Sequence, residues 1–106
     1  MKFAISSGLL DACVLGVLAA EPTYGYDLTQ RLGAQMDISE STLYPVLRRL
    51  MQDGNLESFD MAYDGRNRRY YKITEPGIGL LHESRAAWRQ YKTMVDGFLL
   101  NKEEPA

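Results

Sequence analysis

The sequence has 106 residues, of which 45% are hydrophobic and 25% charged, and its formal net charge at pH 7 is −2. A chain of this length can bury one hydrophobic core but not two, so we expect a single globular domain. The small net charge gives no sign of nucleic-acid binding by the chain as a whole. Cys13 is the only cysteine, which excludes an intramolecular disulfide and favours a reducing cytoplasm.

The residues that carry most enzymatic and metal chemistry are missing from the sequence. His82 is the only histidine, and no second soft ligand lies near it, so a zinc site is not expected. No set of serine, histidine and carboxylate, no pair of cysteines and no phosphate-binding glycine loop can be assembled. We therefore expect neither an enzyme nor a bound cofactor.

The N-terminal region has two possible interpretations. Lys2 followed by the apolar run 3–20 could imitate a secretory signal, but Asp11 and two serines interrupt the run. No segment is long enough to span a bilayer. We therefore expect a cytoplasmic protein with a first helix over about 9–20, which is apolar nearly all round and ends before Pro22.

Two further helices are predicted from apolar residues at helical spacing. One covers about 24–36 and has Thr23 as its N-cap. The next begins near Ser39 or Ser41 and ends at Gly54. Proline is tolerated near the first turn of a helix, so Pro45 favours a start at Ser41.

The third helix is amphipathic. One face carries the apolar residues Leu43, Val46, Leu47 and Leu50, and the other carries Ser41, Pro45, Arg48 and Gln52, flanked by Tyr44 and Arg49. The apolar face is expected to dock on the body of the protein, so the polar face could meet DNA or could simply be solvated. Arg49 could instead pair with Asp53, four residues further on.

A basic hairpin follows this helix. The alternating segments 56–63 and 68–74 are predicted strands, and Asp64-Gly65 is a strong signal for the turn between them. The tip carries Arg66, Asn67 and Arg68. Residues 41–72 hold six basic and four acidic residues, whereas residues 1–40 hold two basic and five acidic ones. Positive charge is therefore local to the segment where a phosphate backbone would need it, although a hairpin tip can also serve only solubility.

A last helix is predicted from Glu75-Pro76-Gly77 to about Leu100. Leu81, Trp88 and Val95 recur every seven residues, as do Ser84, Tyr91 and Phe98, which predicts a seam that a second helix would cover. A second copy of the chain is the expected partner. The predicted fold is mainly α with a small β-hairpin: a winged helix-turn-helix over 1–74, a dimerisation helix over 75–100 and a tail over 101–106.

The chain resembles the PadR family of bacterial transcriptional regulators, in particular its short members with one C-terminal helix. The resemblance covers about residues 9–100 and rests on several motifs in order: Tyr24-Gly25-Tyr26 with Leu28; Ser41-Thr42-Leu43-Tyr44-Pro45 with Leu47, Arg49-Leu50 and Gly54; and Gly65-Arg66 with Arg69-Tyr70-Tyr71, Thr74 and Gly77.

The resemblance implies a homodimeric repressor that binds a palindromic operator and often releases it when a small molecule binds. Short relatives that sense drugs carry a tryptophan at the dimer interface, where planar aromatic compounds stack, and Trp88 matches it. Lys92, one turn after Trp88, departs from that pattern: it stands where an acidic residue would help to hold a cationic drug.

These arguments select three sets of candidate residues. The DNA-binding set is Ser41, Thr42, Tyr44, Pro45, Arg48, Arg66, Asn67 and Arg68. The dimer-interface set is Leu81, Trp88, Tyr91, Val95 and Phe98. The ligand-binding set is Trp88, Ser84, Tyr91, Lys92, Asp11 and Ala12. Lys92 would suit an anionic or phenolic ligand, and Asp11 or Glu83 would suit a cationic one.

Two alternatives stay open on the sequence alone. Trp88 could be a large hydrophobe in a dimer seam with no ligand role. The chain could also be a winged helix that serves only as a protein-interaction module, without specific DNA binding. The intact basic face favours DNA binding.

Overall fold

The computed structural model describes residues 1–101, so all but the first residue of the expected tail lies outside the described part of the chain. Helix α1 spans Ser7–Ala20. It begins two residues earlier than expected because the Ser6 hydroxyl accepts a hydrogen bond from the Leu9 amide at 3.2 Å and caps the first turn.

Helices α2 and α3 span Gly25–Met36 and Glu40–Gln52 and are joined by a short turn. Asp37 adopts a left-handed conformation with φ of 54°, and the Ile38 amide donates to the Gly33 carbonyl at 3.1 Å, which closes the end of α2. Ser39 is the N-cap of α3, so the earlier of the two predicted starts was the better one. The start at Ser41, which Pro45 favours, is wrong: Pro45 lies inside the helix and is exposed to solvent.

Three antiparallel strands form one sheet in the order β1-β3-β2. They are β1 (Thr23–Tyr24), β2 (Leu56–Tyr63) and β3 (Arg66–Ile73). The β2–β3 turn is Asp64-Gly65, as predicted, and both residues have positive φ, the geometry of the tightest hairpins. The pairing begins at Tyr63 and Arg66, so β3 starts two residues earlier than expected.

Strand β1 was not predicted. Thr23 pairs with Tyr71 and Tyr24 with Tyr70, and Tyr24 occupies the N-cap position of α2 without a side-chain cap bond. The predicted cap role of Thr23 is therefore wrong: its hydroxyl donates to the Glu21 carbonyl at 3.1 Å instead. A two-residue strand leaves no periodicity in the sequence by which to find it.

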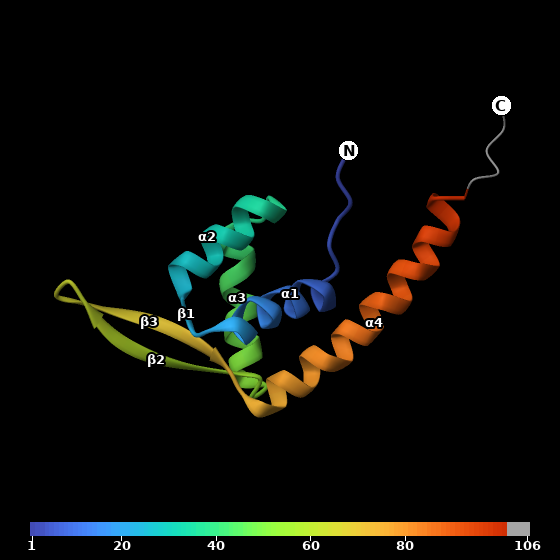
Figure 1. The fold of residues 1–106 in the computed structure, drawn as a ribbon. Coiled ribbons are helices and arrows are strands. Elements are labelled where there is room, and N and C mark those ends of the chain that lie inside the picture. The colour runs from blue at the N-terminus through green and yellow to red at the C-terminus, as the bar shows by residue number, and fades with distance from the viewer. Residues whose placement is uncertain (102–106) are drawn as a thin grey trace.

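Helix α4 spans Glu75–Leu99. Figure 1 shows it leaving the body in one direction while the β2–β3 hairpin projects in another. Thr74 fastens the start of α4: its hydroxyl donates to the Gly54 carbonyl at 2.6 Å and accepts from the Gly77 amide at 3.1 Å. The start of α4 is thereby tied to the loop that follows α3.

The core lies where α1, α2 and α3 meet the inner face of the sheet. Its buried members are Leu10, Val14, Leu15, Leu18, Leu28, Leu32, Leu43, Val46, Leu47, Leu50, Leu56, Tyr71 and Leu81. The four apolar residues predicted for the inner face of α3 are all among them. This arrangement is a winged helix-turn-helix followed by a long helix, as the sequence predicted.

Candidate nucleic-acid interface and helix groove

The outward face of α3 carries most of the predicted DNA-binding residues. Ser41, Thr42, Pro45 and Arg48 are exposed, whereas Tyr44 is half-buried and packs against the core. At the N-terminal end, the Ser39 hydroxyl lies 2.8 Å from that of Ser41 and 3.2 Å from that of Thr42. The first turn of α3 thus presents a cluster of hydroxyls at a helix N-terminus, a combination that suits a phosphate oxygen.

A side-chain contact from α2 also reaches the start of α3. The Gln30 amide donates a hydrogen bond to the Glu40 carboxylate, which fixes the two helices of the helix-turn-helix relative to each other. Sequence reasoning missed this contact because the two residues belong to different helices and share no motif. Glu40 also places a negative charge beside the predicted phosphate site, and the contact with Gln30 orients that charge.

The basic residues of the hairpin divide into paired and unpaired ones. Arg69 lies 3.7 Å from Asp60 and Lys72 lies 3.9 Å from Glu57, both directly across the strands. Within residues 1–101, Arg66 at the hairpin tip has no ion-pair partner, and neither has Arg48 on the outward face of α3. These two guanidinium groups are therefore exposed cations that a phosphate or a base edge could engage.

Asn67 and Arg68 follow Arg66 on β3 but point to opposite faces of the sheet. Asn67 is exposed. The guanidinium of Arg68 is packed against two rings, 4.6 Å from the centroid of Tyr24 and 3.9 Å from that of Tyr63. A contact between Arg68 and DNA stays a prediction, and the structure gives this side chain a second role within the hairpin.

Arg49 forms a contact that the sequence did not predict. Its guanidinium donates to both carboxylate oxygens of Asp11, at 2.8 and 2.6 Å. The hydrogen bond to Asp11 is also the main reason that the pKa of Arg49 is raised. The expected pairing with Asp53 is therefore wrong: Asp53 acts on Arg49 only weakly and through space, because α1 offers a carboxylate in bidentate geometry.

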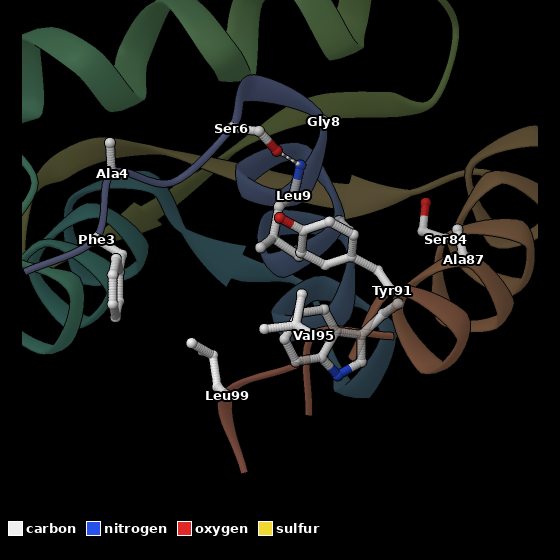
Figure 2. A pocket seen from close by; sticks show the side chains of 12 residues that line it. Phe3, Ala4, Ser6, Gly8, Leu9, Ser84, Ala87, Tyr91, Val95 and Leu99 are labelled. Carbon is white, nitrogen blue, oxygen red and sulfur yellow. Dashed lines mark hydrogen bonds between the residues drawn. The ribbon is translucent and has the colours of Figure 1, made fainter. Parts of the chain in front are cut away.

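A large open groove lies between α4 on one side and α1 with the N-terminal segment on the other. Its volume is about 990 Å³, and it adjoins a second hollow of about 480 Å³. Figure 2 shows Phe3 on one side of the opening and Tyr91, Val95 and Leu99 on the other. Both spaces are lined by Leu9, Ala12, Ser84 and Trp88.

Four of the six predicted ligand-binding residues meet at this groove: Trp88, Ser84, Tyr91 and Ala12. The other two do not line it. Asp11 is turned toward α3 by its bond to Arg49, and Lys92 lies on an exposed part of α4. Phe3 and Leu9 were missed, because nothing in the sequence indicated that the N-terminal segment runs beside α4.

The seam predicted on α4 is only partly available to a partner. Leu81 is 4% exposed within its own chain and belongs to the core. Leu81 therefore offers a partner little surface, because this part of the seam already packs on the body, and its place in a dimer interface stays a prediction. Trp88, Tyr91 and Phe98 are exposed, and Phe98 reaches 81%. Val95 is half-buried.

Several other features bear on the class of protein. Among residues 1–101, no helix is both long and apolar enough to cross a membrane, and no cluster of three potential metal-ligating side chains is found. Cys13 is half-buried beside the smaller hollow, and burial raises the pKa of its thiol. A thiol with a raised pKa is a poor nucleophile.

Comparison with known proteins bears on both the fold and the family. Residues 14–83 match the model of the transcriptional regulator PadR-like family. A transcriptional regulator of Mycobacterium tuberculosis is 39% identical over 85 residues, which cover 79% of each chain.

Two solved structures are also closely similar. A PadR-like transcriptional regulator from Bacillus cereus superposes with a TM-score of 0.81 at 32% identity, covering 90% of this chain and 95% of that one. A protein from Streptococcus mutans superposes with a TM-score of 0.87 at 31% identity, covering both chains completely. The chain therefore belongs to the PadR-like family of transcriptional regulators.

Proposed function

We propose that this regulator acts in the cytoplasm as a homodimeric repressor, which binds an inverted-repeat operator and releases it when a planar aromatic compound enters the groove beside Trp88. The observation that carries the DNA-binding part is the placement of two exposed, unpaired guanidinium groups. Arg48 lies on the outward face of α3, and Arg66 lies at the hairpin tip.

The two arginines suit different parts of a DNA duplex. An α-helix fits the major groove, where an arginine can bond to both acceptors of a guanine edge, and we assign this role to Arg48. The hairpin tip reaches the neighbouring backbone, and we assign Arg66 to phosphate contact. Ser41 and Thr42, at the N-terminus of α3, would orient the helix by bonding to a phosphate.

Dimerisation is supported by the apolar surface of α4 beyond the body. Tyr91, Phe98 and Leu99 are all more than half exposed, and the helix extends past the elements that could cover it (Figure 1). A contiguous apolar stripe of this kind on a small protein favours association. A second copy is the natural cover, because a two-fold dimer of α4 helices would bury the same stripe from both chains.

Ligand sensing is supported by the composition of the groove. Apolar and aromatic side chains line it, and its few polar groups are hydroxyls such as those of Ser84 and Tyr91. The larger space has no charged lining residue, and the smaller one has Arg85 alone. An uncharged or anionic aromatic compound therefore fits better than a cation, which would find no carboxylate facing it.

A mobility-shift assay with the DNA upstream of the protein's own gene tests this proposal. We expect a discrete complex at nanomolar protein that survives excess nonspecific competitor. A purified, folded protein that binds no duplex would instead favour the alternative of a winged helix that contacts only other proteins.

A further inference from the structure

We infer that Asp11 and Arg49 form a positioning clamp, which sets the orientation of α3 for the operator and carries a change at the groove to the DNA-binding face. The inference rests on the proposed function, since it concerns operator binding and its release. Neither residue needs to touch DNA or ligand for the clamp to act. Arg49 was expected to pair within its own helix, so this link between α1 and α3 is a new element of the protein.

The contact has the geometry of a rigid link. Nη1 of Arg49 donates to Oδ2 of Asp11 at 2.8 Å, and Nη2 donates to Oδ1 at 2.6 Å. Two parallel bonds between planar groups fix direction as well as distance, which a single lysine bond would not do. The Asp11 side chain is only 17% exposed, whereas that of Arg49 is 45% exposed. The carboxylate is therefore the more buried partner, and the more exposed arginine side chain extends from α3 to contact it.

Helix α1 contacts both the groove and α3 within one turn. Leu9 and Ala12 line the groove. Between these two in the chain stand Leu10, which is buried in the core, and Asp11, which bonds to Arg49 of α3. A ligand that shifts this turn of α1 necessarily shifts the carboxylate that holds Arg49. Packed helices tend to move between discrete arrangements rather than to deform continuously, so even a small shift would reach α3.

The clamp also determines where Arg48 points. Neighbouring residues on a helix project about 100° apart, as follows from 3.6 residues per turn. With Arg49 held on the side of α1, Arg48 is directed to the open face, where it is exposed. A rotation of α3 that loosened Arg49 would also turn Arg48 away from a base edge.

A competing role for Arg49 predicts the opposite change in DNA affinity when the Asp11 carboxylate is removed. If Arg49 were itself a phosphate contact that Asp11 holds back, removing the carboxylate would free a cation and strengthen DNA binding. If the clamp positions α3, removing it weakens binding while the number of phosphate contacts stays the same. The sign of the change in affinity and the slope of affinity against salt therefore separate the two roles.

The first measurement uses Asp11→Asn and Arg49→Lys, which keep size or charge but lose the paired bonds, with Asp53→Asn as the matched control. Each full-length variant is titrated by fluorescence anisotropy against a duplex selected from a random pool by the wild type, at several salt concentrations. We expect both clamp variants to bind about 2- to 30-fold more weakly with an unchanged salt slope. The control should bind as the wild type does, and circular dichroism should report folded protein throughout.

Tighter binding by Asp11→Asn, or wild-type affinity in both clamp variants, would overturn the positioning role. The double variant Asp11→Asn/Arg49→Lys should be no weaker than the weaker single variant, because both changes break one contact. Fully additive losses would contradict a shared clamp. A wild type that selects no duplex would refute the proposed function itself, which is a different result from any of these.

The second measurement tests the link to the groove, with 8-anilinonaphthalene-1-sulfonate as an anionic aromatic probe. Its binding is followed by its own emission and its effect by release of the duplex. In the wild type, bound probe should lower operator affinity, and in Asp11→Asn the same amount of bound probe should lower it less. An equal loss in both proteins, or bound probe with no effect on the wild type, would overturn the link. A probe that does not bind tells against the proposed groove and leaves the clamp to be judged by the first measurement.

Discussion

The Arg68 guanidinium lies 3.9 Å from the centroid of the Tyr63 ring and 4.6 Å from that of the Tyr24 ring. Tyr63 is the last residue of β2 before the turn, and Tyr24 directly precedes α2. The arginine therefore connects the hairpin near its tip to the strand that leads into the helix-turn-helix. A cation held against aromatic rings is stabilised by their electron-rich faces.

Loss of one ring should loosen the hairpin and weaken DNA binding. We expect Tyr63→Leu to remove a cation–π contact that stabilises the hairpin by about 0.5–1 kcal/mol. The variant should lose affinity for all duplexes by a similar factor, because the hairpin tip is expected to touch backbone rather than bases. Tyr63→Phe keeps the ring and should bind as the wild type does. Fluorescence anisotropy with two unrelated duplexes measures both variants. Equal losses in Tyr63→Leu and Tyr63→Phe would point to the hydroxyl instead of the ring.

Arg48 and Arg66 should differ in how their removal affects binding. Arg48→Ala should cost about 1–3 kcal/mol on the preferred duplex and relax the preference at one base pair. Arg66→Ala should weaken all sequences alike and reduce the salt slope by about one. Titrations of both variants over a salt series and a set of single-base changes give these quantities. Wild-type behaviour in both would show that the wrong face has been assigned to DNA.

Much of this architecture was predictable because it depends on local patterns. The apolar stripe of α3, the Asp64-Gly65 turn and the Glu75-Pro76-Gly77 start of α4 each leave a signal within a few residues. The contacts that define the site leave no such local signal. Asp11 and Arg49 are 38 positions apart in the chain, and the groove joins Phe3 to Leu99.

Periodicity also could not tell which part of α4 packs on its own chain. Leu81 and Trp88 occupy equivalent places in a seven-residue repeat, yet Leu81 is in the core and Trp88 faces the groove. Figure 1 shows α4 running away from the body, so how much of it its own chain covers depends on the angle at which it leaves. No residue of α4 encodes that angle by itself.

The start of α4 offers a test of stability that needs no DNA. A Cβ added at Gly77 would lie 2.1 Å from the Asn55 carbonyl oxygen, whereas one added at Gly79 would meet nothing within 4 Å. We expect Gly77→Ala to destabilise the fold by about 1–3 kcal/mol, the usual cost of overpacking. Gly79→Ala should stabilise it by up to about 1 kcal/mol, because alanine favours the helix. Urea unfolding followed by circular dichroism compares the two. A Gly77→Ala variant as stable as the wild type would contradict the close packing at this junction.

The exposed stripe of α4 predicts the oligomeric state. Light scattering at micromolar concentration should give about 24 kDa, twice the chain mass of 12.0 kDa. Phe98→Glu should lower the measured mass toward that of the monomer, because a buried carboxylate would be left unpaired at the interface. Lys92→Glu, at an exposed site outside the groove lining, serves as the control. A wild type that stays monomeric at this concentration would refute the homodimer.

Trp88 provides an internal reporter for the groove. Uncharged and anionic planar aromatic compounds should quench its fluorescence and lower operator affinity together, because a ligand that prefers one arrangement must disfavour the other. Cationic dyes should quench less, since no carboxylate lines the groove. Quenching without release of DNA would leave a pocket that is not a switch. No quenching by any compound would return Trp88 to a structural role in the dimer.

The most direct test of the account is to select duplexes from a random pool with the purified wild-type protein and to sequence them. A homodimer that presents two α3 helices to successive major grooves should enrich an inverted repeat, with half-site centres about one helical turn, or 34 Å, apart. The same selection with Arg48→Ala should lose the preference at one symmetric pair of positions. Enrichment of no sequence, or of a single site without symmetry, would contradict a sequence-specific homodimer.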